Sequence, residues 1–161
     1  ATLKEAEYEH YEISNFARSG FECVHNLLYW KNNNWWPFGP AAAGHVDGRR
    51  WRNIPRLSDY FSLERLPPIE DVEALDSDKR AGESFMLGLR ILEGIDRSRV
   101  EFLNDQSLDC WRERVIDGHI KEKLLHWKNN KLALTETGIL VADTVISSLL
   151  MHDDLITDTS G

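Results

Sequence analysis

Residues 11–30 read YEISNFARSGFECVHNLLYW and bring together residue types that bind or position ligands. Two apolar runs in this stretch flank a turn that is predicted at residues 18–20. A segment that only packs seldom mixes acid, amide, thiol, imidazole and aromatic side chains so closely. The side chains concerned are Tyr11, Glu12, Asn15, Cys23, His25, Asn26, Tyr29 and Trp30. We therefore expect a ligand site of this chain to include this stretch.

The length and composition predict a globular chain with one domain or two small ones. With 161 residues, 42% of them hydrophobic, the chain can bury a core. It contains no run of about 18 apolar residues, and its opening residues, ATLKEAEYEH, lack the apolar segment of a signal peptide. Cys23 and Cys110 are far apart in sequence and form neither a metal quartet nor a disulfide framework. We therefore expect a cytoplasmic protein without a membrane span.

The net charge of -8 lies entirely in the second part of the chain. Residues 1–66 hold 8 basic and 8 acidic residues, whereas residues 67–161 hold 11 basic and 19 acidic residues. A protein that binds a nucleic-acid backbone needs a cationic surface to neutralise the phosphates. The charge distribution therefore predicts that nucleic acid is not a partner.

Short strands and helices are predicted for residues 1–66. The strands are expected at residues 10–14, 35–38 and 50–54, and the helices at residues 21–31 and 57–64. The small residues 39–44, GPAAAG, predict a loop that either admits a ligand close to the backbone or forms a tight packing corner. Asp47-Gly48 predicts a hairpin turn. A strand at residues 10–14 needs partners, and Ala1 is not an initiating Met, so we expect a piece of a longer protein.

Arginines gather after the predicted hairpin turn, at positions 49, 50, 52 and 56. A cluster of guanidinium groups can bind an anion or a carboxylate because its paired N–H donors match the two oxygens. The same pattern also occurs on the solvated face of a strand. The sequence leaves both interpretations open.

Pro67-Pro68 marks the predicted domain boundary, because tandem prolines cannot continue a helix. Helices are expected after it at residues 76–92, 96–103 and from 107 or 108 onward, with Asp76 as a cap and Gly94 as a stop. A short hairpin is predicted at residues 124–134, followed by a helix capped by Thr135 over residues 135–150. Helices followed by a small hairpin and a further helix resemble a winged-helix module.

Several motifs of the chain resemble the oxygen-independent coproporphyrinogen III oxidase family of radical SAM proteins. The motifs are YEISNFA, FECVHNLLYW, GPAAAGH and RWRN in the first third, and LGLRILEGID and LALTETG in the later part. Within that family the match is best with the branch of haem chaperones (HemW-type proteins). The resemblance implies an α+β fold, with the final strands and helices of a radical SAM barrel in residues 1–66. It further implies a helical, winged-helix-like C-terminal domain in residues 67–161.

The resemblance also implies which cofactors the full-length protein uses. The barrel of this family carries a CxxxCxxC motif that holds a [4Fe–4S] cluster, and the cluster cleaves S-adenosylmethionine. This sequence contains no such motif, and three closely spaced thiolates are needed for one cluster. We therefore expect a C-terminal fragment that binds neither group by itself and contains no catalytic residue. A truncated barrel exposes strand edges, so oligomerisation through that edge is also expected.

The family's HNxxYW motif, which is associated with haem, falls on His25, Asn26, Tyr29 and Trp30. The resemblance implies that His25 is an iron ligand and that the aromatic rings pack on the porphyrin. The alternative is a structural histidine with two core aromatics. Helical spacing predicts that the three rings lie on nearly one side.

The YEISNF strand of the family runs inside the barrel near its substrate end. This resemblance implies that Tyr11, Glu12 and Asn15 bind a substrate or cofactor, at the C-terminal end of a parallel strand. A polar barrel interior without ligand contact is the alternative. The chain departs from the family pattern at Ala41, where a second glycine is common, and at Ser19, where proline is usual. Close approach of a ligand to the loop at Ala41 is therefore less secure.

The resemblance implies that the full-length protein binds haem and transfers it to an acceptor protein. The alternative within the same family is an oxidase that decarboxylates coproporphyrinogen III in porphyrin biosynthesis. A third hypothesis is that residues 76–150 form a winged-helix interaction module. The upstream sequence that distinguishes the first two is outside this chain.

Overall fold

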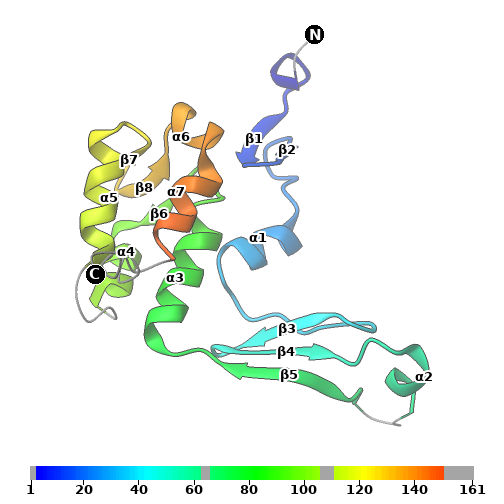
Figure 1. Ribbon diagram of the computed structural model, residues 1–161. Helices are drawn as coiled ribbons and strands as arrows, with labels where there is room; N and C mark the ends of the chain where they lie inside the picture. The colour runs from blue at the N-terminus through cyan, green and yellow to red at the C-terminus, as the bar shows by residue number, and fades with distance from the viewer. Residues whose placement is uncertain (1–2, 63–65, 106–110, 151–161) are drawn as a thin grey trace, which may run out of the picture.

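A computed structural model describes residues 3–62, 66–105 and 111–150 of the chain and shows a mixed α/β structure (Figure 1). A helical body holds the second half of the chain, and a three-stranded sheet projects away from it. Helix α1 (Val24–Trp30) lies between that sheet and an N-terminal hairpin. No helix in the described ranges is long and apolar enough to cross a membrane.

The N-terminal hairpin follows a short 3-10 helix (Leu3–Ala6) and consists of β1 (Glu9–Glu12) and β2 (Asn15–Ala17). Both pairings that the structure shows for β1 are antiparallel, one with β2 and one as a bridge from Glu12 to Ile91. The parallel strand expected here is therefore not found, because residues 13–14 turn the chain back at once. Backbone bonds fix the hairpin to the helical body, from Ile13 N to Arg90 O (3.0 Å) and from Leu92 N to Tyr11 O (3.1 Å).

The projecting sheet is antiparallel with the order β3–β4–β5 and comprises β3 (Ala43–Val46), β4 (Arg49–Asn53) and β5 (Ile69–Ala74). Asp47 (φ 52°) and Gly48 (φ 76°) form the predicted hairpin turn, which requires positive φ at both central positions. A register shift between β4 and β5 coincides with Asp71, whose φ is 53°. Helix α2 (Leu57–Tyr60) lies at the far end of this sheet (Figure 1).

The helical body has the element order α3–β6–α4–α5–β7–β8–α6–α7, and its sheet has the order β6–β8–β7. Asp76 caps α3 by accepting a hydrogen bond from the Lys79 N–H (2.8 Å), and Thr135 caps α6 in the same way from the Gly138 N–H (2.9 Å). The elements are α3 (Ser77–Gly88), β6 (Ile95–Asp96), α4 (Arg97–Asp105), α5 (Trp111–Lys121), β7 (Leu125–Lys128), β8 (Lys131–Leu134), α6 (Glu136–Leu140) and α7 (Ala142–Ser148).

The hydrophobic core lies in this body. Its buried members are Ala81, Phe85, Leu89, Ile95, Val100, Leu103, Ile116, Leu125, Leu132, Leu134, Ala142, Val145, Ile146 and Leu149. They come from both strands and helices, and Ile13 of the N-terminal turn packs against them. The core therefore rests almost wholly on residues 81–149.

Several sequence-based expectations about these elements are wrong. Residues 35–38 form no strand; Trp35 makes a single bridge to His45, and Trp36 and Phe38 are exposed. The expected long helix over residues 76–92 ends at Gly88, because the backbone after it turns to bond with Tyr11 and the residues around it. Gly94 therefore stops no helix and instead lies close to β8. The last helix is divided at Val141 (φ -124°) into α6 and α7.

The predicted domain boundary at Pro67-Pro68 falls directly before β5, which pairs with β4. The division into residues 1–66 and 67–161 stays a prediction. The helix start that the sequence predicts at residue 107 or 108 lies outside the described residues, as does Cys110.

Candidate functional site

Helix α1 presents His25 at the surface. Its ring packs edge-on against Tyr29, one helical turn later, with centroids 4.7 Å apart and planes at 87°. In the described parts of the chain, neither ring nitrogen of His25 has a hydrogen-bond partner, and the side chain is exposed. An imidazole held by one aromatic contact and otherwise free is available to an external ligand.

A row of aromatic rings leads from His25 into the protein. Tyr29 packs on Trp35 (4.6 Å between centroids), and Trp35 packs on His45 (4.8 Å). His45 is 5% exposed, and its Nδ1 lies 3.3 Å from the carbonyl oxygen of Asn33. A proton on Nδ1 donated to that carbonyl leaves Nε2 as the acceptor nitrogen. The predicted motif therefore continues into a second, buried imidazole.

Trp30 points away from this row. The guanidinium of Arg90 lies over the Trp30 ring at 4.9 Å. Trp30 also lines a cavity of about 490 Å³ together with residues of α3 and β6. Asn26 is half-buried. The expectation that His25, Tyr29 and Trp30 share one side of the helix is thus wrong for Trp30, because consecutive helical residues are about 100° apart.

Of the strand residues predicted to form a ligand site, Glu12 and Asn15 come together and Tyr11 does not. The Asn15 side-chain amide donates to one carboxylate oxygen of Glu12, and Glu12 is fully buried. Tyr11 is half-buried and lies at the register shift between His10 and Glu12, and within the described residues its side chain makes no hydrogen bond to Glu12 or Asn15. The second oxygen of Glu12 is buried and has no hydrogen-bond partner among the described residues, as is also true of Trp30 Nε1 and Arg90 Nε. Buried polar atoms normally have partners, so this region fits a further polar group.

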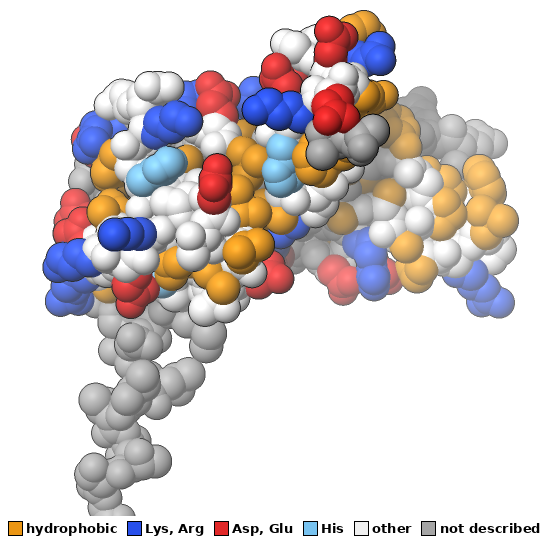
Figure 2. Space-filling view, turned by 90° about the horizontal axis from the view of Figure 1, so that it is seen from above, with side chains coloured by type: hydrophobic (Ala, Val, Ile, Leu, Met, Phe, Trp, Pro, Cys, Tyr) orange, Lys and Arg blue, Asp and Glu red, His pale blue; other side chains and the backbone are white. Residues whose placement is uncertain are grey.

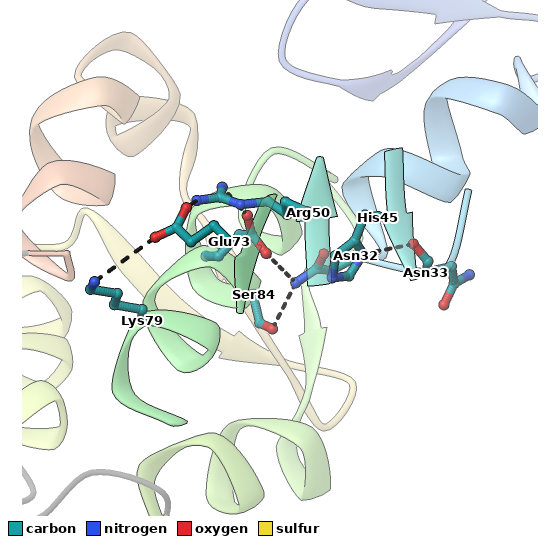
Figure 3. A network of polar contacts seen from close by, with 8 residues as sticks. Asn32, Asn33, His45, Arg50, Glu73, Lys79 and Ser84 are labelled. Atoms are coloured by element: carbon teal, nitrogen blue, oxygen red, sulfur yellow. Dashed lines mark hydrogen bonds and ion pairs between the residues drawn. The ribbon is translucent and has the colours of Figure 1, made fainter. Parts of the chain in front are cut away.

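A polar network joins the turn after α1, the projecting sheet and α3 (Figure 3). The side-chain amide of Asn32 donates to Glu83 and to Ser84, at 3.2 Å each. Arg50 donates from one nitrogen to Glu83 (2.6 Å) and from the other to Glu73 (2.8 Å). The hydrogen bond to Glu73 raises the pKa of Arg50, against an opposing effect of partial burial. The network lies beside a polar cavity of about 270 Å³ that His45 also lines.

The sequence indicated one part of this network, the arginine cluster that includes Arg50, and left open whether it binds a carboxylate. Asn32 suggested only a turn, and its positive φ of 50° agrees with that interpretation. Glu83 and Ser84 lie 51 and 52 residues further along the chain and occupy ordinary helical positions. Only the folded chain brings these groups together.

The chain is similar to proteins named Heme chaperone HemW. It is 33% identical to that of Mycobacterium tuberculosis (strain H37Rv) over 93% of this chain, 32% identical to that of Bacillus subtilis over 87%, and 32% identical to that of Escherichia coli over 92%. It is a homologue of HemW. The resemblance inferred from the motifs is thereby confirmed. No family model matches the chain.

The chain spans about 37–39% of the length of these HemW relatives. Among solved structures, coproporphyrinogen III oxidase (HemN) from Escherichia coli, a radical SAM enzyme, matches over 91% of this chain and 38% of its own, with a TM-score of 0.65. At 16% identity this match shows a shared fold alone. Both comparisons leave most of the longer proteins without a counterpart in this chain.

Proposed function

We propose that this chain is the haem-contacting part of a HemW-like protein, and that His25 ligates the haem iron. The free, exposed imidazole of His25 supports this proposal, since neutral imidazole is a common axial ligand of haem iron. The name of the relatives, Heme chaperone, supplies the ligand class. Tyr29 holds the His25 ring by its edge, and Asn26 follows His25 on α1.

The HemW-like parent binds haem and passes it to an acceptor protein. The exposure of His25 suits a transfer role, because a surface ligand can be exchanged without unfolding the site. One carboxylate oxygen of Glu12 has no hydrogen-bond partner among the described residues, and Asn15 lies beside it. Together with Tyr11 on the same strand, these side chains offer polar groups to the rest of the full-length protein. A [4Fe–4S] cluster and S-adenosylmethionine belong to the remainder of the full-length protein. The alternative is that the full-length protein is an oxidase that decarboxylates coproporphyrinogen III. Activity assays on the full-length protein distinguish this function from haem transfer.

Haem titration of the 161-residue chain tests the proposal. We expect the unsubstituted chain to give the Soret shift of an imidazole-ligated haem iron, and His25→Ala to lose this ligation-specific shift whether or not the porphyrin ring still binds elsewhere on the chain. His126→Ala, which removes a half-buried histidine on β7, serves as the matched control and should retain the shift. An equal shift in His25→Ala and in the unsubstituted chain would show that His25 is not the iron ligand. The absence of a shift in every variant would refute haem ligation by this chain.

We also propose that residues 76–150 form a winged-helix-like module that contacts a protein. The element order α3–β6–α4–α5–β7–β8, with β8 between β6 and β7, supports this assignment. Acidic and basic side chains are interspersed on the face seen in Figure 2, and α5 itself carries both signs. A mixed surface favours a protein partner over a nucleic acid. Binding of the acceptor that persists without residues 1–66 would support the module, and its loss would refute it.

A further inference from the structure

The projecting sheet has two unlike faces. On one face Arg50 and Arg52 form ion pairs with Glu73, Glu83 and Glu70, and this face adjoins α3. The other face is apolar and open, with Trp36 51% exposed, Ile69 53% and Val72 64%. Antiparallel sheets usually present polar side chains on the face that meets water. A contiguous apolar face therefore marks a binding surface.

A groove of about 670 Å³ runs along this apolar face. Trp36 and Trp51 form its aromatic wall, with ring centroids 5.3 Å apart and planes at 68°. The Trp51 ring lies over Gly44 of the neighbouring strand, where an added Cβ would come within 2.7 Å of the indole. Glycine at position 44 is thus needed for the ring to lie across β3, and the aromatic wall is preformed.

One charged side chain in this groove is free to bind a ligand. Arg49 lines the groove and has no ion pair among the described residues. Asp47 also lines it, but its carboxylate accepts a hydrogen bond from the Asn34 amide (2.9 Å). Asn53 is occupied by donating to the carbonyl oxygens of Pro37 and Gly39. Among the described residues that line the groove, Arg49 is the one cation, and it lies beside apolar and aromatic surface, which suits a flat apolar ligand that carries a carboxylate.

The size of the groove favours a small molecule over a protein. Its volume lies within the roughly 300–1,000 Å³ of small-molecule sites. A stable protein interface needs about 800 Å² on each partner, more than the few apolar side chains of this groove provide. The groove also lies on the opposite face of the sheet from His45, because Gly44 and His45 alternate along β3 and the His25–Tyr29–Trp35–His45 row packs on the His45 side.

We propose that this groove binds the face of a porphyrin ring and that Arg49 pairs with one carboxylate of the porphyrin side chains. The groove is a second site, and it does not require coordination of iron. The porphyrin class rests on the proposed haem function; the groove itself rests on its own residues. One of the two indoles, Trp36 or Trp51, stacks on the porphyrin ring and the other meets it edge-on, since their planes are 68° apart, and the Arg49 guanidinium pairs with the carboxylate.

Titration of the 161-residue chain with metal-free protoporphyrin IX tests this site separately from His25, since no iron is present. We expect the porphyrin to bind, with affinity unchanged in His25→Ala and at least about 10-fold weaker in Trp51→Leu and Val72→Asp. Val72 is exposed, so its substitution places a charge in the groove and leaves the fold intact, which circular dichroism checks. Leu140→Asp is the matched control, because Leu140 is 83% exposed on α6, away from the groove.

The carboxylate contact has its own test. Arg49→Gln should weaken protoporphyrin IX binding several-fold, and the dimethyl ester of the porphyrin should bind the parent sequence and Arg49→Gln equally. Unchanged porphyrin affinity in both Trp51→Leu and Val72→Asp would overturn the groove. Dimerisation of the free chain that these two substitutions abolish would also overturn it, in favour of a second copy as occupant. A wild-type chain that binds protoporphyrin IX in the groove but shows no haem-iron signal would support the groove and refute the proposed role of His25.

Discussion

At the scale of single residues, the HNxxYW motif divides its side chains between two environments. His25 and Tyr29 touch each other and continue into Trp35 and His45, whereas Trp30 lies under the Arg90 guanidinium. A motif that is continuous in sequence therefore contributes to a surface imidazole and to the contact between α1 and the end of α3. Trp30 packs against the segment that follows α3, and its part in haem binding stays a prediction.

Glu83 is the residue on which the polar network depends. It is 8% exposed and accepts hydrogen bonds from both Arg50 and Asn32. We expect Glu83→Gln to lower the free energy of unfolding by about 1–3 kcal/mol, because it removes a buried charge partner and leaves Arg50 incompletely paired. Urea denaturation of the chain measures the change.

A surface ion pair on the same sheet provides the control for Glu83. Arg52 pairs with Glu70 (2.7 Å) and with Asp71 (3.0 Å), and the side chains of Arg52, Glu70 and Asp71 are 45%, 34% and 68% exposed. Solvent screens such pairs, so Glu70→Gln should change the free energy of unfolding by less than about 1 kcal/mol. Equal effects of the two substitutions would mean that the Glu83 network adds no more stability than a surface pair.

At the scale of elements, two glycines in helices have opposite roles. Gly138 of α6 lies against the backbone carbonyl of Leu124, where an added Cβ would collide, whereas no atom lies near the same position at Gly118 of α5. The Leu124 carbonyl also accepts a hydrogen bond from the Thr135 N–H (3.0 Å), so it cannot move freely. Close packing thus requires glycine at position 138, whereas position 118 has room for a larger residue.

Alanine substitutions at these two positions should shift stability in opposite directions. We expect Gly138→Ala to destabilise the chain by about 1–3 kcal/mol through overpacking. Gly118→Ala should stabilise it by roughly 0.5–1 kcal/mol, because glycine in a helix interior loses more backbone entropy on folding. Thermal unfolding followed by circular dichroism measures both, and a stabilising Gly138→Ala would contradict the packing of α6 on Leu124.

At the scale of the whole molecule, stability is unevenly distributed. Every buried residue of the hydrophobic core cluster lies within residues 81–149. Arg112, which is 1% exposed, ties the start of α3 to the end of α7 by bonding Asp78 (2.5 Å) and the Leu149 carbonyl (2.9 Å). Within described residues 3–62 and 66–75, Ala17 and Pro37 are the buried apolar side chains. The projecting sheet and hairpin therefore depend on the body to which they attach.

This distribution predicts how the chain responds to division. Residues 76–161 expressed alone should retain helical circular dichroism and unfold cooperatively, because the core remains complete. Residues 1–75 expressed alone should show no cooperative transition, since they bury too little apolar surface to offset chain entropy. Calorimetry of the two fragments checks both statements. A cooperative transition in residues 1–75 would show that the sheet has its own source of stability.

The sequence alone determined the helix caps at Asp76 and Thr135 and the turn at Asp47-Gly48. It also contains the motif that the chain shares with HemW relatives. These features depend on side chains and φ angles within a few residues, so the sequence carries them directly. Tertiary structure alone decided that β5 pairs with β4, that α3 ends at Gly88 and that Trp36 and Trp51 share an open face. Each of these depends on contacts between distant segments, whose free energy outweighs the weak local preference of the backbone.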